Sequence, residues 1–146
     1  MATKPSFRSA FKRRRCLIAA SGSYEWKAAG KAKQPYHFRR RDGKPFLFAG
    51  LWEQWAGDGP PLLTCCLITT DANGLVNPVH DRMPVILTQV AVGPWLDLAT
   101  PADWLQELLA SAPDDLLEAV AVSKTVNSPK NDGPKCIEPA GANPTE

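Results

Sequence analysis

Proline and glycine occur often enough along this chain to limit the length of any helix or strand. The 146 residues include 14 Pro and 10 Gly. Both residues interrupt regular structure, Pro because it lacks a backbone N–H and Gly because its backbone is unusually free. Short apolar, β-favouring segments lie between them. The pattern therefore predicts many turns and short strands rather than long helices.

The order of these segments predicts an α+β domain. Strands are expected over residues 16–20, 24–27, 35–39, 45–55, 62–70, 83–87 and 119–126, and helices over residues 5–15, 90–98 and 101–112. Asp42 and Gly43 carry the signal for a hairpin turn. Short antiparallel strands closing on one core predict a mainly β, barrel-like domain with peripheral helices. We expect one domain over residues 1–139 and a tail at 140–146.

Composition excludes several classes of protein. With 44% hydrophobic and 22% charged residues, the chain is too apolar to be wholly disordered. No apolar run approaches the ~18–20 residues of a membrane helix, and the first residues contain no apolar signal core. We expect a cytoplasmic monomer with no membrane contact. The four cysteines (Cys16, Cys65, Cys66 and Cys136) form no C-x-x-C pair, so reduced thiols are expected, with no metal site and no organic cofactor.

Charge is distributed unevenly although the formal net charge is only +2. Residues 1–44 contain 13 of the 17 Lys and Arg residues and only two acids, a local charge of +11, which leaves −9 on the remainder. Such a distribution indicates an anionic partner for the first third of the chain. Tryptophans such as Trp26 lie among these cations, and cations interleaved with aromatic rings are typical of single-stranded nucleic-acid binding.

Two segments place titratable side chains where apolar residues would otherwise be expected. Glu25 lies between Tyr24 and Trp26, so we expect it to be partly desolvated and suited to proton transfer near neutral pH. The alternative is a strand-edge carboxylate paired with Lys27 or a nearby arginine, and the segment alone favours this alternative.

The second segment is His80-Asp81-Arg82, which precedes an apolar strand and lies between two prolines. Histidine can act as an acid or a base near neutrality. A structural histidine, with Asp81 capping the turn, is an equally good interpretation. The other histidine, His37, alternates within a strand and is expected to pack against a neighbouring strand.

Five blocks of residues together resemble a known family. They are Arg15-Cys16-Leu17-Ile18 with Tyr24-Glu25-Trp26, Phe48-Ala49-Gly50-Leu51-Trp52-Glu53, Ile68-Thr69-Thr70-Asp71-Ala72-Asn73, His80-Asp81-Arg82-Met83-Pro84, and Val122-Ser123-Lys124 with Val126-Asn127. In this order they resemble the SOS-response-associated peptidase (SRAP) family. The resemblance implies a barrel-like α+β fold that binds single-stranded DNA at abasic sites. It also implies covalent capture, because the family's N-terminal Cys condenses with the sugar aldehyde to form a thiazolidine.

The resemblance assigns roles to four residues. Glu25 and His80 match the family's catalytic glutamate and histidine: the histidine moves a proton as the deoxyribose opens, and the glutamate holds or deprotonates the attacking amine. Trp26 and Arg82 match residues at the DNA, Trp26 as a stacking surface and Arg82 as a phosphate contact. An associated self-processing peptidase activity is also implied.

Position 2 departs from the family pattern because it is Ala rather than Cys. We expect this chain to lack the family's N-terminal third, and with it the thiol that a thiazolidine requires. The alternative to covalent capture is therefore a non-covalent single-stranded DNA-binding protein that keeps Glu25, His80 and Arg82. A further alternative is a core fragment that neither folds well nor binds DNA.

Overall fold

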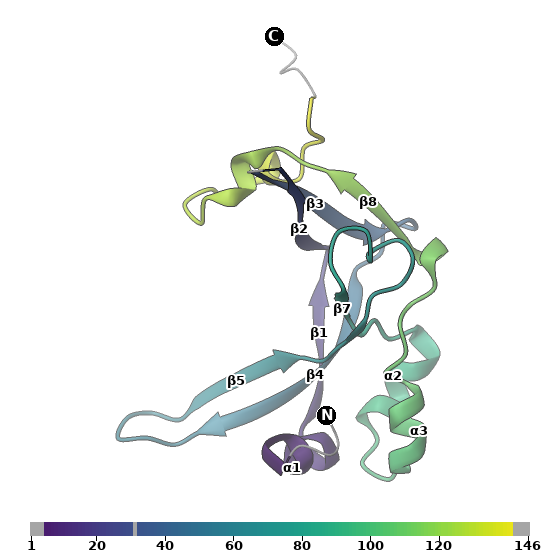
Figure 1. Cartoon of the computed structure of the whole chain (residues 1–146). Coiled ribbons are helices and arrows are strands. Elements are labelled where there is room, and N and C mark those ends of the chain that lie inside the picture. Colours follow the sequence, from purple (N-terminus) through teal and green to yellow (C-terminus); the bar gives the residue numbers. More distant parts are fainter. Residues whose placement is uncertain (1–4, 31, 142–146) are drawn as a thin grey trace. The chain divides into compact units, whose positions relative to one another are not determined.

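The structure is a computed structural model that describes residues 5–30 and 32–141 (Figure 1). The chain divides into two compact units. Unit 1 comprises Met1–Ala20, Phe46–Asp71 and Met83–Ala112, and unit 2 comprises Ser21–Pro45, Ala72–Arg82 and Pro113–Glu146. Each unit is thus assembled from segments that are separated in the sequence.

Unit 1 is built on a three-stranded antiparallel sheet in the order β1-β4-β5. The strands are β1 (Arg15–Ala20), β4 (Phe46–Trp55) and β5 (Leu62–Leu67). Cys16 pairs with Gly50, and Leu51 pairs with Cys66. The shorter β6 (Thr69–Asp71) pairs with β7 (Arg82–Pro84). Three helices complete the unit: α1 (Pro5–Arg13), α2 (Gln89–Leu96) and α3 (Ala102–Glu107).

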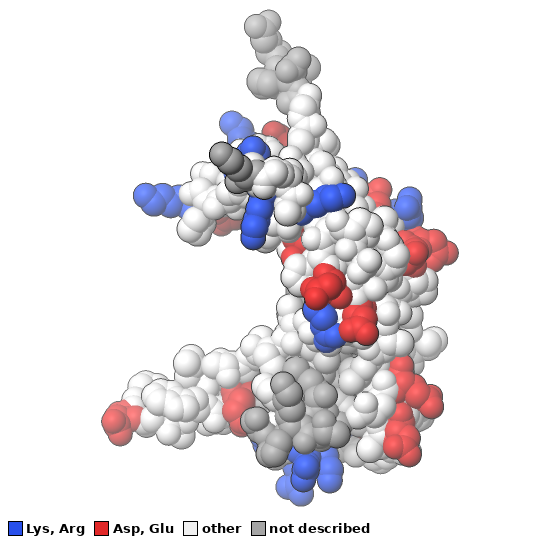
Figure 2. All heavy atoms as spheres, viewed as in Figure 1, with Lys and Arg blue, Asp and Glu red and all other residues white. Residues whose placement is uncertain are grey.

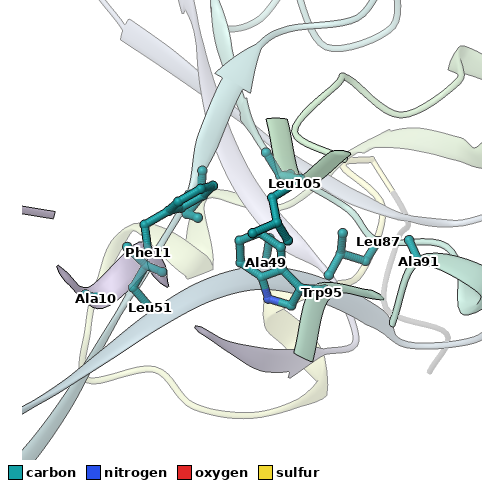
Figure 3. Packing of buried hydrophobic residues seen from close by; sticks show 10 residues of the cluster. Ala10, Phe11, Ala49, Leu51, Leu87, Ala91, Trp95 and Leu105 are labelled. Carbon is teal, nitrogen blue, oxygen red and sulfur yellow. The ribbon is translucent and has the colours of Figure 1, made fainter. Parts of the chain in front are cut away.

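The core of unit 1 forms where the helices meet the sheet. Figure 3 shows Phe11 of α1, Trp95 of α2 and Leu105 of α3 among the buried residues. The Phe11 and Trp95 rings meet edge to face, with their centroids 5.9 Å apart. Trp95 is fully buried, and its indole Nε1 donates a hydrogen bond to the Cys16 carbonyl at 2.9 Å. A large buried ring with a satisfied N–H fixes α2 against β1.

Arg15 places a buried guanidinium beside this core. It donates hydrogen bonds to the carbonyls of Phe11 (2.7 Å), Lys12 (3.0 Å), Trp95 and Asp97 (2.7 Å). These carbonyls lie near the C-terminal ends of α1 and α2, where a helix leaves carbonyl groups without partners. Burial lowers the pKa of Arg15, although the nearby Asp97 carboxylate opposes this effect. Arg15 therefore joins the ends of two helices.

Unit 2 contains a second three-stranded antiparallel sheet, in the order β2-β3-β8. The strands are β2 (Ser23–Ala29), β3 (Ala32–Arg40) and β8 (Leu117–Ala121). Gly30 adopts a positive φ of 61° between β2 and β3, which any side chain would disfavour. Three 3-10 helices flank β8: η1 (Asp114–Leu116), η2 (Lys124–Asn127) and η3 (Pro134–Cys136). β2 is thus an edge strand of this sheet.

His37 is buried in β3, the central strand, and packs against the edge strand as the sequence predicts. Its ring lies 5.1 Å from that of Tyr24. A Cβ added to Gly22 would lie 2.0 Å from His37 Nε2 and 2.8 Å from the Phe38 carbonyl, so only glycine fits beside this ring. Burial lowers the pKa of His37, and the charge of Arg39 lowers it further. Both effects favour the neutral form of the histidine.

The predicted hairpin at Asp42-Gly43 is wrong. Gly43 does take a positive φ of 70°, so the turn forms. The strands on either side of it nevertheless join different sheets: β3 pairs with β2 and β8, whereas β4 pairs with β1 and β5. Turn chemistry specifies a change of chain direction, but pairing partners are chosen by side-chain burial across the whole unit.

The α+β class with antiparallel sheets is confirmed, with two differences in detail. Among the described residues the sheets are open, so the term barrel-like applies only loosely. The helix expected over 101–112 covers only Ala102–Glu107, and Trp104 is about half exposed. The single domain over 1–139 stays a prediction, as does the tail, of which 142–146 lie outside the described residues. No helix in the described part of the chain is long and apolar enough to cross a membrane.

Candidate functional site

The edge strand β2 carries the first two predicted site residues. Glu25 pairs with Tyr36 and Trp26 with Pro35 in the antiparallel register of β2 and β3. Glu25 is partly buried and Trp26 is 36% exposed. Glu25 makes no ion pair within 4 Å with any described cation. The structure therefore does not support the alternative of an ion-paired strand carboxylate with a described partner.

His80 lies near the end of a closed loop, residues 72–81, which precedes β7. The Ala72 N–H donates to the Asp81 carbonyl at 2.9 Å, and the His80 N–H donates to the Val76 carbonyl at 3.0 Å. These hydrogen bonds hold the backbone of the loop, which contains no regular strand or helix. His80 itself remains exposed. A rigid backbone with an exposed imidazole suits a residue that meets a ligand.

The Nδ1 atom of His80 has both a donor and an acceptor within reach on Arg82. The Arg82 backbone N–H lies 3.0 Å from Nδ1, and the Arg82 carbonyl oxygen lies 3.1 Å from it. Nδ1 can accept from the first or donate to the second, so either neutral tautomer of the ring finds a partner. The other ring nitrogen, Nε2, can accordingly serve as a proton donor or a proton acceptor without loss of the Nδ1 contact.

A cavity of about 490 Å³ brings the predicted residues together within unit 2. It is lined by Glu25, Trp26, Lys33, His80 and Asn127. Three of these five residues are predicted site residues, and they come from β2 and from the loop ending at His80. The cavity thus combines a carboxylate, an imidazole, an indole, an amide and an ammonium group. This set can move protons and can hold a polar, anionic ligand beside an aromatic surface.

Asn127 anchors the indole of Trp26. The indole Nε1 donates to Asn127 Oδ1 at 2.8 Å. Asn127 ends η2, whose first turn is capped by Ser123 Oγ accepting from the Thr125 N–H at 3.2 Å. The Trp26 ring also lies 6.4 Å from the Tyr24 ring. These two contacts restrict the indole before a ligand binds, so less conformational entropy is lost on binding.

Sequence reasoning missed Lys33 and Asn127 as cavity residues. Asn127 belongs to the last of the five blocks of residues, so the pattern pointed to it without indicating a role. Lys33 carried no signal beyond the general basic charge of the first third. Arg82, in contrast, does not line the cavity: it is exposed, and its backbone supports His80. A contact between Arg82 and DNA stays a prediction.

The basic residues of the first third are shared between the two units, and several are neutralised. Arg39 pairs with Glu118, and Arg40 makes two hydrogen bonds of 2.6–2.8 Å to Asp42. These bonds hold the pKa of the Asp42 carboxyl well below its usual range. Arg14 pairs with Glu53 at 2.6 Å. Figure 2 shows further Lys and Arg side chains at the surface of each unit. The local charge of +11 counted from the sequence therefore overstates the positive charge that is free to meet a ligand.

The described residues contain no group of three or more His, Cys, Asp or Glu side chains that could hold a metal ion. The cysteines are free thiols. Burial, together with the nearby Cys65 and Cys66, raises the pKa of the Cys16 thiol, which disfavours the reactive thiolate there.

Curated relatives align with nearly all of this chain, but each of them is longer than it. The abasic site processing protein YoqW of Bacillus subtilis is 45% identical over 141 residues, which are 94% of this chain and 63% of the relative. The abasic site processing protein HMCES of Gallus gallus is 33% identical over 162 residues, covering 95% of this chain and 48% of the relative. The chain thus spans slightly less than two thirds of the length of the first relative and about half that of the second.

A solved structure supports the fold. A crystal structure of a protein from Bacteroides thetaiotaomicron matches with a TM-score of 0.88 and 30% sequence identity, covering 95% of this chain and 62% of that protein. The family model described as "SOS response associated peptidase (SRAP)" matches residues 1–129. The agreement of family model, relatives and fold leads to one conclusion: the chain belongs to the SRAP family.

Proposed function

We propose that this chain recognises abasic sites in single-stranded DNA and receives the exposed sugar in the cavity lined by Glu25, Trp26 and His80. The single observation that carries the proposal is that this cavity unites residues from two distant segments of the sequence. The printed names of the relatives, abasic site processing proteins, supply the substrate class. The chain's own aromatic and cationic residues are suited to an unstacked strand.

The cavity residues divide the chemistry of an abasic sugar between them. Opening the closed deoxyribose requires a proton to leave the C1′ hydroxyl and a proton to reach the ring oxygen. His80 is suited to this transfer because both of its tautomers have a backbone partner. Glu25 is suited to hold or accept the proton of an attacking amine. Trp26, anchored by Asn127, offers a ring face beside the vacant base position.

The covalent step implied by the family resemblance cannot use position 2 of this chain. Residue 2 is Ala and lies outside the described residues. Without a thiol there, no thiazolidine forms on that residue. We therefore propose recognition of the abasic site and opening of its sugar as the function of this chain, with non-covalent binding as its measurable core.

Fluorescence anisotropy with a labelled single-stranded oligonucleotide tests the proposal. The oligonucleotide carries one tetrahydrofuran residue, an abasic analogue without an aldehyde, and is compared with the same strand carrying thymidine. We expect tighter binding to the abasic strand, and a loss of about 5-fold or more in Trp26→Ala, because stacking contributes ~1–3 kcal/mol per base. Arg82→Ala should reduce the log–log salt slope by about 0.7 if Arg82 contacts one phosphate.

A matched control is available in unit 1. Trp55 is 61% exposed on β4, outside the cavity, so Trp55→Ala should leave the preference for the abasic strand unchanged. Equal binding to both strands by the unmodified chain would refute the proposed specificity. An equal loss in both tryptophan variants would refute the assignment of the site to the cavity. No binding at all would favour the core-fragment alternative.

A further inference from the structure

We propose that the side-chain amine of Lys33 condenses with the aldehyde of the opened abasic sugar and forms a reversible imine. This inference rests on the proposed function, because it requires the sugar to enter the cavity of unit 2. It assigns to Lys33 an activity that does not depend on a thiol at position 2.

The register of β2 and β3 places Lys33 beside Trp26. Trp26 pairs with Pro35 and Ala28 pairs with Lys33. Because alternate residues share one face of a sheet, Trp26 and Lys33 lie on the same face, one diagonal step apart. Lys33 lines the same cavity as Glu25 and His80. A sugar stacked beside the indole would therefore be within the region that the lysine side chain can reach.

Lys33 is also chemically available. It is exposed, and it makes no ion pair with any carboxylate in the described part of the chain. Two other cations of unit 2 are engaged: Arg39 with Glu118 and Arg40 with Asp42. Glu25, in the same cavity, has no described cation as a partner either. An amine without an ion-pair partner, lining one cavity with a carboxylate and an imidazole, is suited to carbonyl chemistry.

The reaction balances with the groups present. Glu25 accepts one proton from the Lys33 ammonium, and the neutral Nζ attacks C1′ of the aldehyde, so that a C–N bond forms and the carbonyl electrons move to oxygen. His80 relays two protons to this oxygen, one from the attacking nitrogen and the one that Glu25 holds; the oxygen leaves as water while the nitrogen lone pair forms the C=N bond, and Glu25 is again a carboxylate. One ammonium and one aldehyde thus give one protonated imine and one water. No oxidant, reductant or metal is needed.

Borohydride trapping tests the inference on the full chain. The chain is mixed with a single-stranded oligonucleotide carrying a true abasic site, sodium borohydride reduces any imine to a stable amine, and a denaturing gel separates the adduct. We expect an adduct with the unmodified chain and at least a 10-fold decrease in Lys33→Arg, which keeps the positive charge. Peptide mapping by mass spectrometry should place the sugar remnant on Lys33.

Lys27 provides the matched control. It is an exposed lysine on β2, it pairs with Gln34, and it does not line the cavity. Lys27→Arg should leave the adduct yield unchanged. Circular dichroism of both variants checks that they fold, and anisotropy with the tetrahydrofuran strand, which has no aldehyde, measures the Kd of each variant so that adduct yields are compared at an equal bound fraction.

The outcomes separate this inference from the proposed function. Selective binding to the tetrahydrofuran strand without an adduct would overturn the role of Lys33 and leave the proposed function intact. An adduct that maps to the chain's α-amine, or that is spread over several lysines, would also overturn it. If the unmodified chain neither binds the tetrahydrofuran strand nor forms an adduct, the proposed function itself is refuted.

Discussion

The hydrogen bond between Trp26 and Asn127 offers a quantitative test of how the cavity is organised. Trp26→Phe removes the indole N–H but keeps an aromatic ring, and Asn127→Leu removes the accepting oxygen at similar size. If the bond orients the indole for DNA, each variant should weaken binding to the abasic strand. The two changes together should cost no more than the larger single change, because both remove the same interaction.

The expected magnitude follows from the geometry. The Nε1–Oδ1 distance of 2.8 Å is that of a good hydrogen bond, and such a bond contributes about 0.5–1.5 kcal/mol net. Both residues are partly accessible to water, which can replace either partner, so we expect the lower part of this range. A coupling energy of about 0.5–1 kcal/mol corresponds to roughly a 2- to 5-fold change in Kd.

Anisotropy titrations of four proteins with the tetrahydrofuran strand provide the measurement: the unmodified chain, the two single variants and the double variant. The coupling energy is obtained from the four Kd values. A full effect of Asn127→Leu in the Trp26→Phe background would refute the reasoning, since Asn127 would then act without the indole. Unchanged salt slopes in all four proteins would confirm that phosphate contacts are not involved.

Three further predictions concern the scaffold. Arg15→Lys should lower the free energy of unfolding in urea by about 2–4 kcal/mol, because one ammonium cannot serve carbonyls on two helix ends; an unchanged midpoint would contradict this. Gly22→Ala should destabilise by about 1–3 kcal/mol, because its Cβ would collide with His37 and a backbone carbonyl; thermal melting measures the loss, and an unchanged Tm would count against it. Because folding lowers the pKa of His37, the unfolded chain binds a proton at this histidine at a higher pH than the folded chain does. The free energy of unfolding should therefore be highest above the ordinary pKa of 6.5 and should decrease as the pH falls below it. His37→Gln should flatten the decline of Tm between pH 7 and pH 5, and an equally steep decline would show that another group causes it.

Local sequence patterns predicted the elements better than their partners. Positions of β1, β4 and α2 were close to the residues expected, because apolar runs bounded by Gly and Pro mark short elements well. The Asp42-Gly43 turn was also anticipated. Its two strands nevertheless pair elsewhere, since the choice of partner depends on segments far away in the sequence that no local pattern contains.

The site was predictable only in part for a similar reason. Glu25 and His80 were marked by polar side chains in apolar surroundings and by the family resemblance. Lys33 was one cation among many, and only the register of β2 with β3 and the cavity distinguish it. Asn127 depends on a contact with Trp26 across 101 residues of sequence. Spacing along the chain carries no information about such a contact.

The interleaving of the two units also has a consequence for folding. Segments of unit 2 alternate along the chain with segments of unit 1, so neither unit can be excised as one continuous fragment. The cavity needs β2 from early in the chain and Asn127 from late in it. During synthesis the cavity therefore cannot form until the C-terminal segment that contains Asn127 has been made. Contacts at such long sequence separation also form slowly. The cavity should be among the last features of the molecule to become ordered, and exposed strand edges before that point make the nascent chain prone to aggregation.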